Sequence, residues 1–226
     1  MSVLTAELRS EADAIVAKYP NSRSAVLPLL FLVQSVEGYV TDEGMREVAD
    51  ILELTPAQVL GAASFYTMLK KKDQGMYLIS VCRNIACTHL GGRELLNTFE
   101  DLLQIKAGET TPDGRFSLEA AECLATCDGA PSLQVNYEDF YRVTPEKARD
   151  LISRLERDES LASERGELVK DAKTISREVA RAGVRIPHGE VEDLRTIGGE
   201  GPRVDAATGF RPKERGYKRE GDDGGS

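Results

Sequence analysis

The sequence predicts an α+β protein in which a bundle of helices precedes an α/β domain with a mixed sheet. Three observations lead to this prediction. Apolar residues recur at helical spacing as far as about residue 70, strand and helix patterns alternate from there to about residue 158, and the rest is rich in glycine and charge. We therefore expect a helical domain at 1–70, an α/β domain at 71–158 and an extended or disordered tail at 159–226, in which residues 160–183 could form a marginal helix.

Four amphipathic helices are expected in the first domain, and residues that favour helix ends mark their limits. The signals are a stop at Tyr19-Pro20, a second helix from Ser22 or Ser24 to Gly38, a Thr41 cap for a third, and a Thr55-Pro56 start for a fourth. Because an amphipathic helix must bury one side, the four should pack together. No histidine or cysteine occurs before residue 70, so we expect no catalytic chemistry in this domain.

The second domain begins with a strand that is apolar on both faces, MYLISVC at 76–82. A helix that starts at Asn84 or Thr88 follows, with Leu95, Leu96, Phe99, Leu102 and Leu103 directed inward. The remaining elements are expected to be strands at 116–120, 133–136 and 140–143, with a turn at 137–139 before the last strand, and a helix capped by Thr144-Pro145.

The predicted order of elements is β-α-β-β-β-α, which is that of a thioredoxin-like core. The helix between the first two strands implies a right-handed crossover and a parallel strand pair. Pro131 precedes the third strand, where the thioredoxin fold has a cis-proline, although a trans peptide bond is equally open. The fold class is therefore a helical bundle, a thioredoxin-like domain and a disordered C-terminal tail.

Composition excludes several function classes. The net charge is −9, no strong basic stripe occurs before residue 160 and there is no tryptophan, so nucleic acid is not an expected partner. The longest apolar run, 25–33, contains Pro28 and is too short to cross a bilayer, so no direct membrane insertion is expected. The first residues lack the apolar block of a signal peptide. We expect an intracellular protein with reduced thiols.

All four cysteines of the chain fall in the predicted α/β domain, in two pairs. Cys82 and Cys87 have four residues between them, and Cys123 and Cys127 have three. Each pair follows the carboxyl end of a predicted strand. Because these two strands should be parallel neighbours, both pairs are expected at the same edge of the sheet, where open α/β sheets bind ligands. Small residues beside the pairs, Gly91, Gly92, Gly129 and Ala130, would allow the backbone to approach a bound group.

Several kinds of site could use four thiols. Structural zinc sites usually have two residues between paired ligands, which neither pair has. A [2Fe–2S] cluster takes two thiolates on each iron, and two cysteine pairs match this stoichiometry. A Rieske centre would need His89 and His188 as well, and a dithiol enzyme would need a C-x-x-C pair. The spacing favours a [2Fe–2S] cluster, with zinc and purely structural cysteines as the alternatives.

Two stretches carry a resemblance to a known family. SVCRNIACTHLGG at 80–92 and AAECLATCDGAPSLQVN at 120–136 resemble the thioredoxin-like [2Fe–2S] ferredoxin subunit, also called the 24 kDa subunit, of NADH:quinone oxidoreductase (respiratory complex I). The helices before residue 70 are also similar to the helical domain of that family. The resemblance covers about residues 10 to 158 and leaves the tail unmatched.

The resemblance implies that Cys82, Cys87, Cys123 and Cys127 ligate one [2Fe–2S] cluster. It implies an electron-transfer subunit that passes electrons to and from the FMN of an adjacent NADH-oxidising flavoprotein subunit, among other peripheral-arm subunits. FMN and NADH would lie on that partner, so this chain would be part of an NADH dehydrogenase without catalytic residues of its own. The implied location is cytoplasmic, on the cytoplasmic face of the inner membrane. The cluster could serve as an electron reservoir or as structural support.

Three other functions remain open at this point. Homologous diaphorase subunits of NAD-linked hydrogenases or formate dehydrogenases share the same domains and cysteines. A free-standing electron carrier would have no need of the helical domain, and a zinc-binding scaffold would have no redox function. Exposed apolar residues such as Phe65, Tyr66, Phe140 and Tyr141 are candidates for a partner surface, although ordinary core membership is the favoured interpretation for each.

Overall fold

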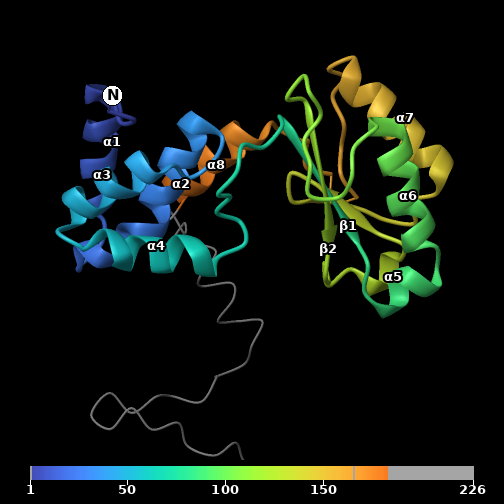
Figure 1. The fold of residues 1–226 in the computed structure, drawn as a ribbon, viewed down its shortest axis with the longest axis horizontal. Helices are drawn as coiled ribbons and strands as arrows, with labels where there is room; N and C mark the ends of the chain where they lie inside the picture. The colour runs from blue at the N-terminus through green and yellow to red at the C-terminus, as the bar shows by residue number, and fades with distance from the viewer. Residues whose placement is uncertain (1, 165, 183–226) are drawn as a thin grey trace, which may run out of the picture. The chain divides into compact units, whose positions relative to one another are not determined.

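The structure is a computed structural model, and it describes residues 2–164 and 166–182 (Figure 1). Two hydrophobic cores divide this part of the chain. We call residues 2–70 with 172–182 the helical part, and residues 76–161 the sheet part. No helix among the described residues has the length and apolar character that crossing a membrane requires.

Four α-helices and a short 3-10 helix make up the first 65 residues: α1 (Ala6–Val16), η1 (Ser22–Ala25), α2 (Val26–Glu37), α3 (Asp42–Leu52) and α4 (Pro56–Phe65). Thr41 accepts a hydrogen bond from the Gly44 amide at the start of α3, and Thr55 forms a capping box with Gln58 at the start of α4. Gly38 ends α2 with a φ of 89°. The predicted caps and this stop are therefore present at the expected positions.

Helix α2 lies at the centre of the helical part. It carries apolar residues all round, and Leu29, Leu30, Leu32 and Val33 are fully buried. A helix with this pattern must be covered on every side. The covering residues come from the neighbouring helices, and they include Leu8, Ala12 and Ile15 of α1, Met45, Val48 and Leu52 of α3, and Val59 and Ala63 of α4.

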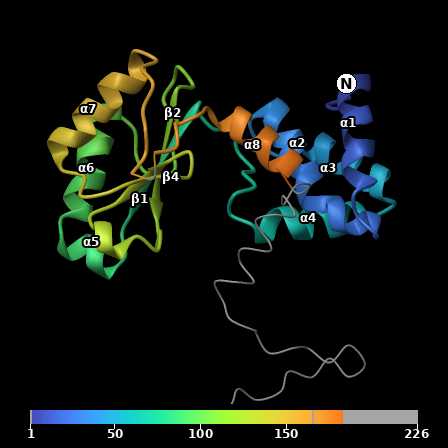
Figure 2. The same cartoon turned by 180° about the vertical axis from the view of Figure 1, so that it is seen from behind.

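Part of the segment after residue 158 forms a helix, which was the alternative to a disordered stretch there. Ala172–Ala182 form helix α8, which lies beside α2 in both views (Figures 1 and 2). Ala180 is fully buried in the helical core, and Ser176 is buried against Gln34 of α2. The amphipathic pattern of α8 is short and charged, and it forms a helix here because α2 offers an apolar face to cover. Residues 183–226 lie outside the described residues.

The sheet part contains a four-stranded mixed sheet and helices on one of its faces (Figure 1). The chain order is β1 (Tyr77–Cys82), α5 (Ile85–His89), α6 (Gly92–Leu103), β2 (Phe116–Ala121), η2 (Cys127–Gly129), β3 (Leu133–Val135), β4 (Glu138–Phe140) and α7 (Pro145–Glu156). The strand order is β2-β1-β3-β4, with β1 parallel to β2 and antiparallel to β3. The predicted parallel pair is therefore present.

Side chains alternate across this sheet. Ile79 and Val81 of β1 and Leu118 of β2 belong to the core with Leu95 and Phe99 of α6. The opposite face carries polar groups, among them Ser80, Glu119 and Gln134. The register places Ser80 beside Glu119, and Cys82 beside Ala121 at the carboxyl ends of β1 and β2.

Three predictions in the sheet part were wrong in detail. The single helix predicted after β1 is two helices, because Gly91 has a φ of 102° and ends α5 before α6 begins. The fourth strand is at 138–140 instead of 140–143. Asn136 and Tyr137 both have positive φ and form a two-residue hairpin turn, which brings the strand forward. Leu102, predicted to point inward, is 37% exposed. The Ala130–Pro131 bond is cis.

Candidate metal centre

Cys82 and Cys87 lie on either side of the turn that leaves β1. Cys82 is the last residue of the strand, and Cys87 lies in α5. The side chain of Asn84 accepts a hydrogen bond from the Ile85 amide at the start of this helix, and Thr88 Oγ1 donates to the Arg83 carbonyl oxygen at 2.7 Å. These bonds fix the turn between the two cysteines. Both side chains are buried.

Cys123 and Cys127 belong to the loop that leaves β2. Cys127 begins the short helix η2, and both cysteines are exposed. Ala125 has a φ of 58°, and its amide donates to Cys123 Sγ at 3.4 Å. The chain therefore curls around the Cys123 sulfur, and at least one backbone N–H already points at it. Amide donors of this kind stabilise a thiolate that binds metal.

The two cysteine loops are joined directly. The Arg83 amide, next to Cys82, donates to the Ala121 carbonyl oxygen at 2.9 Å, and the Arg83 side chain forms an ion pair with Glu122, next to Cys123. The four thiols therefore lie on two connected loops at one end of the β1–β2 pair. Within the described residues, no three Cys, His, Asp or Glu side chains are placed to share a metal ion. The structure thus brings the loops together, with one thiol pair buried and the other exposed.

The surroundings of Cys87 fit a bound thiolate cluster. Ser132 is fully buried, and its Oγ lies 3.5 Å from Cys87 Sγ and 2.6 Å from Thr126 Oγ1. A Cβ on Gly92 would lie 2.8 Å from the Cys87 carbonyl oxygen, so only glycine lets α6 begin this close to the loop. All four cysteines are free thiols. A set of four sulfur donors, with hydroxyl and amide donors nearby, suits iron–sulfur ligation.

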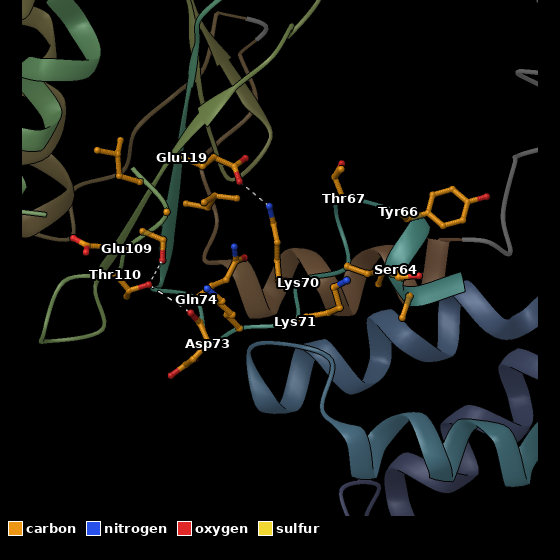
Figure 3. Close-up of a pocket in the computed structure, with 17 residues that line it drawn as sticks. Ser64, Tyr66, Thr67, Lys70, Lys71, Asp73, Gln74, Glu109, Thr110 and Glu119 are labelled. Atoms are coloured by element: carbon orange, nitrogen blue, oxygen red, sulfur yellow. Dashed lines mark hydrogen bonds and ion pairs between the residues drawn. The ribbon is translucent and has the colours of Figure 1, made fainter. Parts of the chain in front are cut away.

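Sequence reasoning missed the polar residues next to these loops. A cavity of about 630 Å³ is lined by Cys123 and its neighbours together with Ser80, Glu119, Gln134, Tyr137 and Lys70. Lys70 Nζ lies 2.9 Å from Glu119 Oε2, and Figure 3, a close-up of another pocket that these two residues also line, marks this ion pair with a dashed line. The two residues are far apart in the chain, so no local motif indicated the pair. The alternation of β1 and β2 could have placed Ser80 and Glu119 on one face.

Tyr137 in this cavity stays neutral. Burial, and then the negative charge of Glu119, raise the pKa of its phenol to about 12. The phenol is therefore uncharged at any physiological pH. The acidic and basic side chains on this face of the sheet include Glu119, Lys70 and Asp139, whose Oδ1 accepts a hydrogen bond from Gln134 Nε2 at 2.8 Å.

Comparison with known proteins gives a family, several relatives and a similar solved structure. The family model for the thioredoxin-like [2Fe–2S] ferredoxin matches residues 12–156. The E-type subunit of the NADH-quinone oxidoreductase of Mycobacterium tuberculosis is 44% identical over 161 residues, which are 71% of this chain and 64% of that protein. The corresponding protein of Aquifex aeolicus is 34% identical over 66% of this chain and 92% of its own length. A crystal structure of an NAD⁺-reducing [NiFe]-hydrogenase matches with 22% identity and a TM-score of 0.48, over 51% of this chain and 20% of that chain.

Proposed function

Because the chain belongs to the thioredoxin-like [2Fe–2S] ferredoxin family, we propose that Cys82, Cys87, Cys123 and Cys127 bind one [2Fe–2S] cluster. The observation that carries this proposal is the pairing of the thiols at the carboxyl ends of two adjacent parallel strands. Two cysteines on each loop provide two thiolates for each iron. When bound, such a cluster accepts and returns one electron at a time.

The contribution of this chain would be ligation and control of the cluster surroundings. Cys82 and Cys87 are buried, so they would anchor the inner side of the group. Cys123 and Cys127 are exposed on the second loop and would supply the other two thiolates. The Ala125 amide and the Ser132 hydroxyl would donate to sulfur and so stabilise the reduced state.

We further propose that the protein is the electron-transfer 24 kDa-type subunit of an NADH:quinone oxidoreductase. The support is the name and identity of the mycobacterial and Aquifex relatives. Since the match spans 64% of the mycobacterial protein, the activity and the partners rest on this proposal. The partner would be an NADH-oxidising flavoprotein subunit carrying FMN, with other peripheral-arm subunits nearby. The assembled complex would lie on the cytoplasmic face of the membrane.

The first experiment is metal analysis of anaerobically purified protein. About two irons and two acid-labile sulfides per chain, with a rhombic spin-half EPR signal after dithionite reduction, are expected for one all-cysteine [2Fe–2S] cluster. One zinc per chain without sulfide, unchanged after reconstitution with iron and sulfide, would contradict the electron-transfer proposal. Such a result would favour a zinc-binding scaffold.

Single substitutions then test the ligands. Cys123→Ser should reduce iron and sulfide per chain and weaken co-purification with the flavoprotein subunit. Ser64→Ala, an exposed residue of α4, is the control and should retain both. A Cys123→Ser protein with normal iron content and an unchanged EPR spectrum would show that Cys123 is not a ligand. Co-purification also separates the parent complexes, because a diaphorase subunit would associate with hydrogenase or formate dehydrogenase subunits instead.

A further inference from the structure

A three-residue polar network lies beside the cysteine loops, on the sheet face opposite α6. The Glu119 carboxylate accepts a hydrogen bond from Ser80 Oγ at 2.7 Å and forms an ion pair with Lys70 Nζ at 2.9 Å. Each carboxylate oxygen thus has its own partner. The Lys70 side chain is only 14% exposed, whereas Glu119 is 36% exposed. The ammonium is therefore held at this carboxylate, and solvent screens it less than a surface lysine.

This network is close to the candidate centre along the strands. Ser80 and Cys82 point to the same face of β1, as Glu119 and Ala121 do on β2. The Ser80–Glu119 pair precedes the Cys82–Ala121 pair by two residues, which corresponds to about 7 Å. Glu119, Lys70 and Cys123 also line one cavity. A charge here would act on a group bound by the cysteines.

Lys70 is placed by the helical part. Its amide donates to Gln34 Oε1 at 2.7 Å, and its carbonyl oxygen accepts from the Val40 amide at 2.7 Å. Gln34 is 4% exposed and is itself fixed, because its Nε2 donates to the Met68 carbonyl oxygen and to Ser176 Oγ. Hydrogen bonds thus fix both the amide and the carbonyl group of Lys70, and the side chain extends from this fixed backbone to Glu119 of β2.

From these contacts we infer that Lys70 is a positioning residue for the redox centre, supplied by the helical part to neutralise Glu119. The inference rests on the proposed function. Reduction adds one electron, and hence one negative charge, to the bound group. A nearby carboxylate opposes that change and a nearby ammonium favours it. With Lys70 in place the carboxylate does not lower the reduction potential, and the helical part sets the potential of the centre through Glu119.

The test is a redox titration of the cluster in the unsubstituted protein and in four variants, followed by EPR with dithionite as the electron donor. At the midpoint potential of the unsubstituted protein, Lys70→Met should lower the ratio of reduced to oxidised centre by about threefold. Glu119→Gln should raise the ratio by about the same factor. The double variant should return close to the original value. Lys70→Arg keeps the charge and should restore the ratio.

The matched control is the ion pair between Lys106 and Glu100, at 2.7 Å. These residues lie at or beyond the C-terminal end of α6, and Cys87 precedes the N-terminal end of that helix. Lys106→Met and Glu100→Gln change the net charge equally and should leave the ratio unchanged. If Lys70→Met and Glu119→Gln shift the ratio in the same direction, or no further than these controls, the inference is overturned.

The outcomes separate this inference from the proposed function. A purified chain without iron and sulfide contradicts the proposed function before any variant is made. Normal iron and sulfide with equal potentials in all variants leaves the cluster in place and removes only the role of Lys70. If Lys70→Met does not fold, the comparison of Glu119→Gln with Glu100→Gln tests the inference by itself. The reduced fraction of the centre must then rise in Glu119→Gln and stay unchanged in Glu100→Gln.

Discussion

Asn136 illustrates how much a single residue contributes to the sheet part. Its side chain accepts a hydrogen bond from the Leu78 amide at 2.7 Å and donates to the carbonyl oxygens of Met76 and Lys170. The residue is 1% exposed and has a φ of 47°. Its hydrogen bonds therefore connect the hairpin turn to the start of β1 and to the segment that leads to α8. The sequence pattern indicated only that it is the last residue of a strand.

We predict that Asn136→Ala lowers the free energy of unfolding by about 2–4 kcal/mol, since two backbone carbonyls and one amide lose a buried partner. Urea unfolding checks this value. Asn97→Ala, at an exposed position of α6, is the control and should stay within about 0.5 kcal/mol of the original. A similar small change for Asn136→Ala would mean that water or relaxation replaces these bonds.

Gly129 is a second residue whose role depends on packing. A Cβ at this position would lie 2.2 Å from Cγ of the Tyr141 ring. We predict that Gly129→Ala lowers the free energy of unfolding by about 1–3 kcal/mol and also reduces iron retention, because the ring is pressed against the Cys127 loop. Gly61→Ala, where a Cβ meets nothing within 4 Å, is the control and should be tolerated. Equal behaviour of the two variants would contradict this account.

At the scale of elements, helix ends were the most predictable features. Thr41, Thr55 and Thr144 cap helices as expected, because a side-chain oxygen at these positions accepts a free amide. Positions that depend on backbone twist were less predictable. The two-residue turn at Asn136 and Tyr137 contains no glycine, so the start of β4 could not be placed from composition.

Two helices end at a residue with positive φ, one at a glutamate and the other at a glycine. Substitutions at these two positions should therefore change the stability in opposite directions. Glu53 ends α3 at a φ of 54° and is exposed, and Glu53→Gly should raise the free energy of unfolding by about 0.5–1 kcal/mol. Gly38 ends α2 at a φ of 89°, and Gly38→Ala should lower it by about 1–2 kcal/mol. Thermal unfolding of both variants measures the changes. The same sign for both would show that contacts outweigh backbone conformation at these ends.

At the scale of the whole molecule, the cysteine loops were predictable, whereas the contacts between distant segments were not. The positions of the cysteines followed from strand order alone, because parallel neighbours end at one edge. The Lys70–Glu119 pair joins residues 49 positions apart, and the α2–α8 contact joins residues 142 positions apart. No periodic pattern in the sequence predicts contacts between such distant residues. The family model ends at residue 156, before α8, so it does not predict the α2–α8 contact either.

Removal of α8 should therefore destabilise the helical part. We predict that a chain ending at Asp171 unfolds at a lower temperature than one ending at Ala182, because Ser176 and Ala180 no longer cover α2. The iron content of the two chains should be equal, since the cysteine loops are untouched. Circular dichroism and metal analysis provide both measurements. Equal melting temperatures would show that α8 adds no stability.

Acid should release the same helix. Burial alone would raise the pKa of Glu11, but the guanidinium groups of Arg181 and Arg177 outweigh it and lower the pKa below its usual value of 4.5. Glu11 therefore binds a proton more readily in the unfolded chain than in the folded one. The stability that ionised Glu11 contributes to the fold is complete above about pH 4.5 and is lost as the pH falls through the lowered pKa. Hydrogen exchange of α8 amides should accelerate in that range. Glu11→Gln should remove the dependence, and its persistence would assign the effect to other carboxylates.

The return of the chain to the helical part has a consequence for biosynthesis. The Gln34 side chain meets Ser176 only after all of the sheet part has been translated. Until then, the side of α2 that contacts α8 lacks its covering helix, because α8 has not been made. The cysteine loops emerge before this point, so the sheet part can receive its cluster while the helical part is still open. Completion of α8 would then mark a chain in which both cysteine loops have already been translated.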